Sequence, residues 1–481
     1  MNVVQRLTQT VNQRIPIDWV LWPGLLATLL LIYLPDIGHG FIKDDFVWIV
    51  TSRADNVFDL FALFTETNDF YRPIVGLSFA ANWKLFGLEP FGYALTNLAI
   101  LVASAVALRH LCTALGMTAG SAWLAAGLWS LNYYGINISL LWISGRTSLL
   151  VTLFSLLSAT AFVRHQRYQS AVWALLAMLS KEEAVLLPFV MLLWAGFSIG
   201  DVTSRRSIRL NLRLVLRSVF PLFLALAVYM VARTASGGMT PMSAPAAYQF
   251  TFHFWSLAGN LASYMDRAGT LSGGVLFLLA LSAARLPQPN GRQWRWVKLG
   301  VVWMLGGLSL AVLLPIRSSL HAVGPSAGAA LAGAALITAL WDHAAKLART
   351  RMAITGILIV SIILVPVHWS RNDKWADWAI LSTHVLKKIG PLAATLPTGS
   401  VIQVNDDRDH RINLDASFGT LIETAVTAYT GQHLHIWMEP PPIDWQSAGL
   451  VRPHQQDITA TFILDSPHLI GPADRPREPD S

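Results

Sequence analysis

The sequence predicts an all-α polytopic membrane protein that ends in a small α/β domain. Of its 481 residues, 54% are hydrophobic and 13% are charged, which is more apolar surface than a water-soluble chain of this length can bury. Apolar runs close to the 20 residues needed to cross the hydrocarbon core recur from Trp19 to about Trp369 and then stop. We therefore expect a membrane domain over residues 1–369 and a soluble domain over residues 370–481.

Hydropathy places about eleven transmembrane helices in the first domain. The first apolar run lacks a small-residue cleavage site, so we interpret it as a signal anchor. The expected helices lie near residues 18–35, 90–110, 119–136, 143–163, 170–180, 184–199, 215–234, 269–285, 299–315, 325–342 and 352–369.

The charges between these helices predict their orientation. With the N-terminus in the cytoplasm, every short interior segment is rich in Arg or Lys, and the acids among them are Asp18, Asp201 and Asp342. The opposite orientation would break the positive-inside rule at every loop. We therefore expect an integral protein of a bacterial inner membrane, with residues 370–481 in the periplasm.

The net charge of +7 has an ordinary explanation in this topology. Basic loops attract anionic membrane lipids, which are the expected partners of these residues. Nucleic-acid binding is disfavoured because the arginines are spread over many loops instead of one folded face. The single cysteine, Cys112, excludes an intrachain disulfide and a multi-cysteine metal site.

The first exterior loop, residues 36–89, contains two segments with apolar residues at helical spacing. Residues 57–67 and 72–87 are too short or too polar to span a membrane. They could form amphipathic helices on the outer leaflet or, equally well, helices packed on the bundle. In both cases they would cover a cavity beside Asp44 and Asp45.

Most charges of the membrane domain that have no obvious partner fall on the exterior side. Charges at membrane depth are costly and are usually retained for a partner or a substrate. A carboxylate can act as general base toward an attacking hydroxyl, and cations can neutralise a departing lipid phosphate. The candidate base residues are Asp44 and Asp45, the candidate phosphate ligands are Arg72, Arg146, Lys181, Arg317 and His321, and the auxiliary acids are Glu182 and Glu183.

Other interpretations of these charges remain open. Each cation could instead form a salt bridge between helices, and an isolated Asp-Asp pair is more often structural than catalytic. A transporter or flippase of lipid-linked sugars would also place charges in a cavity, but it should show internal repeats. A non-catalytic scaffold would use the same fold without the chemistry. No cofactor is expected, and a divalent metal is not favoured because a third clear acidic ligand is missing.

Five runs, in order along residues 35–345, carry a resemblance to a known family. The segments "FIKDDFVWI", "FYRPIVGLSFAANWKLFGLEPFGYALTNLAIL", "LLWISGRTSLLVTLFSLLSATAF", "LLAMLSKEEAVLLPFVMLL" and "LLPIRSSLHAVGPSAGAAL" resemble the GT-C superfamily of glycosyltransferases that use polyprenyl-phosphate sugars. The nearest branch is that of the transmembrane O-mannosyltransferases with tetratricopeptide repeats, together with their bacterial relatives.

The resemblance implies an inverting glycosyltransferase with a polyprenyl-phosphate-linked sugar as donor and an extracytoplasmic hydroxyl on a protein, lipid or polysaccharide as acceptor. It also implies that the catalytic acid is Asp44 or Asp45, with Asp44 matching the first acid of the family's pair. The sequence departs from that branch in two places. No 34-residue repeat follows Trp369, and residues 317–326 read "RSSLHAVGPS", so that His321 would take the place of an aromatic phosphate contact.

The C-terminal segment has the pattern of a small α/β domain. Strands are expected at 399–406, 434–439 and 457–466, with a helix at 418–431 that ends at Gly431. Residues 405–413 are rich in oxygen ligands but lack the glycine and final glutamate of an EF-hand, so we interpret them as a solvated loop. We expect the tail, residues 471–481, to be disordered.

Overall fold

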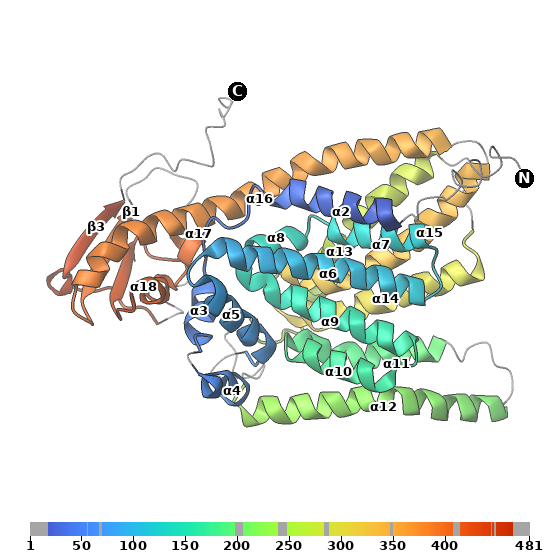
Figure 1. The fold of residues 1–481 in the computed structure, drawn as a ribbon, viewed down its shortest axis with the longest axis horizontal. Coiled ribbons are helices and arrows are strands. Elements are labelled where there is room, and N and C mark those ends of the chain that lie inside the picture. The colour runs from blue at the N-terminus through green and yellow to red at the C-terminus, as the bar shows by residue number, and fades with distance from the viewer. Residues whose placement is uncertain are drawn as a thin grey trace, which may run out of the picture.

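The computed structural model of the chain is mostly helical, with one small sheet near the C-terminus (Figure 1). It describes residues 18–54, 56–66, 70–197, 205–238, 248–282, 288–346, 350–406, 414–443, 445–446 and 449–464. The expected N-terminal basic residues, most of the 405–413 loop and the C-terminal tail lie outside these residues.

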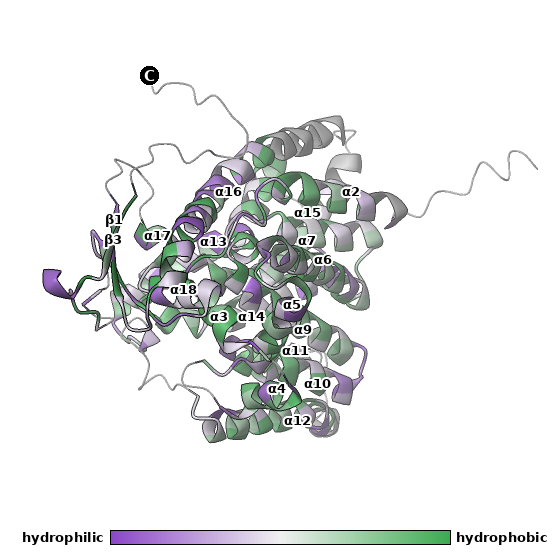
Figure 2. Ribbon diagram, turned by 60° about the vertical axis from the view of Figure 1, so that its left-hand side comes forward, coloured by the Kyte–Doolittle hydropathy of each residue, from purple (hydrophilic) through white to green (hydrophobic). Residues whose placement is uncertain are grey.

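A bundle of helices lies between Asp18 and Thr395, and each expected span coincides with a helix. Hydrophobic residues predominate along these helices in Figure 2. The helices are α2 (Asp18–Tyr33), α6 (Pro90–Ala114), α7 (Ala119–Ser130), α8 (Ile136–Leu141), α9 (Arg146–Val163), α10 (Arg167–Met178), α11 (Leu187–Phe197), α12 (Arg205–Ala235), α13 (Phe254–Ser282), α14 (Gly291–Leu308), α15 (Val323–Lys346) and α16 (Thr350–Thr395). Short 3-10 turns lie at Ile143–Gly145, Glu182–Leu186, Ala311–Leu313 and Ser319–Ala322.

Five helical stretches in the described part of the chain are long and apolar enough to cross a membrane: Pro90–Ala114, Ile143–Val163, Arg213–Ala235, Gly291–Leu313 and Ser319–Trp341. This number is smaller than the expected eleven. Of the six other expected spans, four fall on α2, α7, α10 and α11, whose 16, 12, 12 and 11 residues are fewer than the roughly 20 that a full crossing requires. The other two fall on α13 and α16, which are longer but are not among these five stretches.

Small residues bring α14 and α15 close together. A Cβ added to Gly300 would lie 2.5 Å from the carbonyl oxygen of Gly328, and one added to Gly328 would lie 2.3 Å from that of Gly300. Such contacts let two helix backbones approach where lipid removes the hydrophobic driving force. The indole of Trp303 on α14 also donates to the carbonyl of Gly324 on α15 at 3.0 Å. This helix pair forms one wall beside the site described below.

The first loop, residues 36–89, contains three helices: α3 (Asp45–Thr51), α4 (Val57–Thr65) and α5 (Pro73–Phe86). The two expected helices are present, and α3 is additional. Each of the two expected helices matches a different one of the two alternatives. Helix α4 buries none of its residues and exposes Phe58 by 83%, as a surface amphipathic helix would, whereas α5 buries Val75 and Phe79 against the bundle.

The C-terminal part contains a parallel sheet of three strands in the order β2-β1-β3, formed by His435–Glu439, Val401–Asp406 and Ala460–Leu464. Val401 pairs with His435, and Ile402 pairs with Ala460. Helices α17 (Leu414–Phe418) and α18 (Ile422–Thr430) pack beside the sheet, and α18 ends at Gly431 in the left-handed conformation that glycine favours. The expected strands and the helix end are therefore present.

The C-terminal part and the first loop share one hydrophobic core. Phe46 of α3 stacks on Phe418 of α17 with ring centroids 6.0 Å apart, within a cluster that also includes Val75 and Val404. Helix α16 runs through the boundary expected at residues 369/370 and ends only at Thr395. Figure 1 shows α3, α4, α5 and the sheet at one end of the bundle, which we call the site end.

Candidate active site

The two adjacent aspartates at the start of α3 have different environments. Asp44 is exposed, whereas Asp45 is completely buried. One carboxylate oxygen of Asp45 accepts hydrogen bonds from the backbone N–H and the hydroxyl of Ser144, at 2.6 and 2.5 Å, and the other accepts from the backbone N–H of Ile42 at 3.0 Å. Lys43, with φ 48°, provides the left-handed turn just before the pair. Asp45 therefore fastens the first loop to the turn before α9, and Asp44 faces outward.

Burial also changes the acidity of Asp45. Loss of solvent raises the pKa of its carboxyl to about 7, and the neighbouring charge of Asp44 adds to the rise. The hydrogen bonds from Ile42 and Ser144 act in the opposite direction because they favour the ionised form. The pKa of this carboxyl is thus close to neutral pH.

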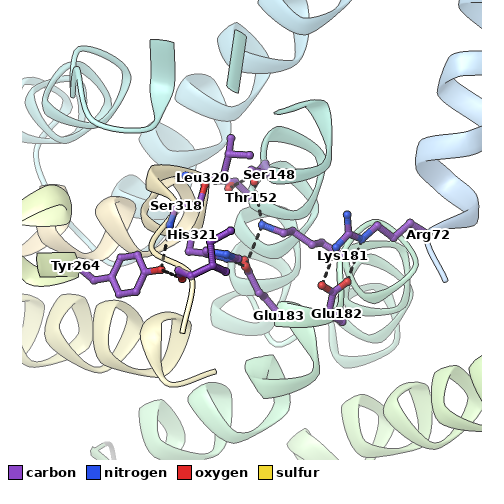
Figure 3. A network of polar contacts seen from close by, with 11 residues as sticks. Arg72, Ser148, Thr152, Lys181, Glu182, Glu183, Tyr264, Ser318, Leu320 and His321 are labelled. Atoms are coloured by element: carbon purple, nitrogen blue, oxygen red, sulfur yellow. Dashed lines mark hydrogen bonds and ion pairs between the residues drawn. The ribbon is translucent and has the colours of Figure 1, made fainter. Parts of the chain in front are cut away.

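A polar cluster formed by Arg72, Lys181, Glu182, Glu183 and His321 lies at the site end (Figure 3). The Arg72 guanidinium donates to both carboxylate oxygens of Glu182, from Nε at 3.0 Å and from Nη2 at 2.7 Å. Burial alone would raise the pKa of Glu182, but the charge and hydrogen bonds of Arg72 outweigh it and lower this pKa to about 2. Arg72 also lies over the Phe70 ring, 4.2 Å from its centroid.

The second half of the polar cluster centres on Glu183. Its Oε1 lies 2.9 Å from Nζ of Lys181 and also contacts Nδ1 of His321. Lys181 in turn donates to the hydroxyl of Ser148 on α9 at 3.1 Å. These contacts join the turn before α11, helix α9 and the turn before α15 (Figure 3). Next to Glu183 is an apolar cavity of about 60 Å³ between α9, α11, α14 and α15, bordered by Trp303 and Pro325.

Arg317 differs from the other cations of the site end. It is exposed, and its Nε donates to Oδ1 of Asn260 at 2.6 Å. Asn260 is held by its own hydrogen bonds to the carbonyls of Val312 and Leu314, at 2.9 and 2.8 Å. Within the described part of the chain, Arg317 has no carboxylate partner within salt-bridge distance. Its remaining donors are therefore available to an anion.

Arg146 is fully buried and has no such availability. Its Nε donates to Oδ1 of Asn97 at 2.7 Å, its Nη2 to the carbonyl of Tyr93 at 3.0 Å, and its Nη1 to Ser78 at 3.2 Å. The guanidinium also lies over the Phe79 ring, 4.6 Å from its centroid. These contacts join α9 to α5 and α6, so they differ from those of an exposed phosphate ligand.

Tyr248 connects the acidic pair with the polar cluster. Its ring lies against Phe70 with centroids 5.2 Å apart, and Phe70 in turn carries the Arg72 guanidinium. Burial raises the pKa of the Tyr248 hydroxyl, and the negative charge of Asp44 raises this pKa further. Tyr248, Ser144 and Asn260 belong to no sequence motif. Their contacts are with residues far away in the chain, so the sequence alone does not indicate them.

The residues that the structure describes do not supply a metal site. Among them, no group of three or more His, Cys, Asp or Glu side chains is placed to hold an ion.

Comparison with known proteins finds distant structural likenesses. No protein-family model matches the sequence, and no curated protein matches it. The structure is similar to the oligosaccharyltransferase AglB from Archaeoglobus fulgidus, solved with an inhibitory peptide and a dolichol-phosphate, with a TM-score of 0.48 and 10% sequence identity over 87% of this chain and 64% of that chain. It is also similar to ArnT from Cupriavidus metallidurans bound to undecaprenyl phosphate, with a TM-score of 0.47 and 13% identity over 93% of this chain and 90% of that chain.

The present chain thus spans less than two thirds of the AglB chain. With TM-scores below 0.5, these likenesses concern the overall course of the chain. An assignment of activity has to rest on the residues of the site itself.

Proposed function

We propose that this protein is an inverting glycosyltransferase that moves a sugar from a polyprenyl-phosphate carrier to a hydroxyl acceptor, with Asp44 as general base. The observation that supports this proposal most directly is the division of roles between the two aspartates. Asp45 is buried and uses both oxygens in structural hydrogen bonds, so Asp44 is the carboxylate of the pair that a substrate can reach.

The proposed reaction is a single displacement. The Asp44 carboxylate takes the proton of the acceptor hydroxyl while the hydroxyl oxygen forms a bond to the anomeric carbon. The bond from that carbon to the carrier phosphate breaks, and the phosphate leaves with the electron pair. Attack from the face opposite the leaving group inverts the configuration. The departing phosphate gains negative charge, which nearby cations stabilise.

Among these cations we assign the first phosphate contact to Arg317, because Asn260 orients it and no carboxylate among the described residues neutralises it. Arg72 and Lys181 are already paired with Glu182 and Glu183. In this mechanism, these two ion pairs and His321 form a polar side of the site next to the leaving phosphate. We assign Arg146 a positioning role, since it holds α9 against α6.

The test is a transfer assay with the purified full chain and a panel of polyprenyl-phosphate sugars, which measures both hydrolysis of the donor and transfer to added acceptors. Replacing Asp44 by Asn keeps the size of the side chain but removes its ability to accept a proton. We expect transfer to fall by roughly 10²–10⁴, with donor binding largely retained. Asp373→Asn, at an exposed position of α16, is the matched control and should leave transfer unchanged.

A folded variant with both Asp44→Asn and Asp45→Asn that still transfers sugar at the wild-type rate would refute the assignment of the base. The same result would make the acidic pair a structural element, and Glu182 and Glu183 would become the next candidates. A transporter or flippase, or a scaffold, would show no transfer with any donor of the panel.

A further inference from the structure

A groove runs between α10 and α12, and these two helices carry all of its lining residues. Its volume is about 430 Å³. The two helices pack against each other along this groove, and they lie side by side in Figure 1. Ala171 on α10 and the buried Pro221 and Ala225 on α12 form its floor, where small side chains leave room.

The walls of the groove are apolar and exposed. Tyr168, Phe220 and Leu224 are exposed by 66%, 66% and 55%, and they lie within or beside the membrane-spanning stretch of α12. A contiguous apolar surface of this kind is unfavourable in water, so hydrocarbon is its natural environment. The groove extends along α12 from Arg217 to Val228, over about 16 Å at the rise of 1.5 Å per residue. That length suits part of an acyl chain.

Two arginines lie at one end of this apolar groove. The Arg167 guanidinium lies 4.7 Å from the centroid of the Tyr168 ring and donates to the Tyr168 hydroxyl at 3.1 Å. Arg217 is exposed on the neighbouring helix, α12. No acidic residue lines the groove, and neither arginine has a carboxylate within salt-bridge distance in the described part of the chain. Two guanidinium groups without an acid favour a phosphate as their partner.

We propose that the groove between α10 and α12 binds an anionic phospholipid, with its phosphate at Arg167 and Arg217 and an acyl chain along Phe220, Leu224 and Val228. Basic pockets between membrane helices bind lipid head groups in this way. The groove is distinct from the candidate active site, since Arg167 begins α10 while Lys181 follows the far end of that helix. The inference therefore does not depend on the proposed function.

The experiment uses the purified full chain, stripped of lipid in detergent and titrated with dioleoyl-phosphatidylglycerol or dioleoyl-phosphatidylcholine, with bound lipids counted by native mass spectrometry. We expect the anionic lipid to bind at least roughly ten-fold more tightly than the zwitterionic one. The double variant Arg167→Gln with Arg217→Gln should lose this preference, and Arg167→Lys with Arg217→Lys should keep much of it. Ala171→Phe should block the groove and weaken binding of the anionic lipid while every charge stays in place.

The control is Arg292→Gln with Arg295→Gln, which removes the same charge from exposed positions at the start of α14. The start of α14 lies beside the end of α6, where Trp296 donates to the carbonyl of Leu115 at 2.9 Å. The control should keep the preference. An equal loss in this control, equal binding of both lipids by the wild type, or unchanged binding by Ala171→Phe would overturn the proposal. So would a mass showing that a second copy of the chain occupies the groove.

Discussion

The carboxylate of Asp45 accepts two hydrogen bonds from Ser144, one from the backbone N–H at 2.6 Å and one from the hydroxyl at 2.5 Å. The two residues are 99 positions apart, and both are buried. This contact holds the start of α3 on the turn before α9. It therefore sets the position of Asp44, the next residue toward the N-terminus.

Replacing Ser144 by Ala should destabilise the protein, because the buried carboxyl group of Asp45 loses a hydroxyl donor and keeps only the backbone N–H groups of Ser144 and Ile42. We expect the free energy of unfolding to fall by about 1–3 kcal/mol. Thermal or denaturant unfolding in one detergent measures it. Ser218→Ala is the control, since that hydroxyl bonds only its own helix at 2.8 Å, and it should change stability by less than about 0.5 kcal/mol. Equal losses in both variants would show that the Ser144 hydroxyl does not hold Asp45 in place.

The pKa of Asp45, raised to about 7 by burial, predicts a pH dependence of stability. Between about pH 4, the pKa of an unfolded Asp, and pH 7, the folded protein keeps a proton that the unfolded chain has released. Stability should therefore fall as the pH rises through this window, by up to about 1.4 kcal/mol per pH unit. Unfolding at several pH values measures the slope, and the Asp45→Asn variant should lack this contribution. Identical profiles for the two proteins would show that Asp45 does not titrate in this range.

Arg317 and Arg146 should respond differently to substitution by Gln. Arg317→Gln should weaken binding of a polyprenyl-phosphate donor by roughly 10- to 100-fold, the value of one charge-assisted hydrogen bond, with little change in stability. Arg146→Gln should destabilise the fold by about 1–3 kcal/mol, because buried acceptors on α5 and α6 lose their donor. Donor binding and unfolding, measured on both variants, separate the two roles. The reverse pattern would exchange their assignments.

Gly40 should tolerate no larger residue, because a Cβ there would lie 2.3 Å from the carbonyl oxygen of Ala379 on α16. Gly40→Ala should cost about 1–3 kcal/mol of stability, since the first loop could no longer approach α16. Gly127→Ala on α7 is the control, with no neighbouring atom within 4 Å, and it should be neutral or stabilising by up to about 1 kcal/mol. Similar effects in unfolding experiments would argue against this close approach.

The charge pattern of the loops predicts that residues 370–481 face the exterior and that the loop around Ser207 faces the cytoplasm. Reporter fusions at Ser207 and at Gly399 should therefore report opposite sides of the membrane. The first loop and the sheet share one core at the site end, so both should lie on the same side of the membrane (Figure 1). Fusions on the same side would remove the basis of both the topology and the proposed active site.

The helices could be predicted from local sequence because hydropathy and helical period are properties of neighbouring residues. The apolar runs locate α6, α9 and α15, and Gly431 marks the end of α18. The expected boundary at residues 369/370 falls inside α16. Hydropathy falls near Trp369 because the residues that follow are more polar. Helix α16 nevertheless continues to Thr395, since polar residues are compatible with a helix. Helix α3 was not expected from the sequence, because its seven residues are too few to show a helical period.

The roles within the candidate site depend on contacts that no local pattern contains. Asp44 and Asp45 are adjacent in the sequence, and only the packed structure shows that Asp45 is buried and bonded to Ser144 and Ile42 while Asp44 is exposed. Arg146 and Arg317 are both expected exterior arginines in the sequence. In the structure, Arg146 is buried and bonded to Asn97 and Tyr93, whereas Arg317 is exposed and bonded to Asn260. Composition and periodicity thus determine which segments are helical and apolar. Burial and pairing depend on residues far apart in the chain, and these are set only when the helices pack.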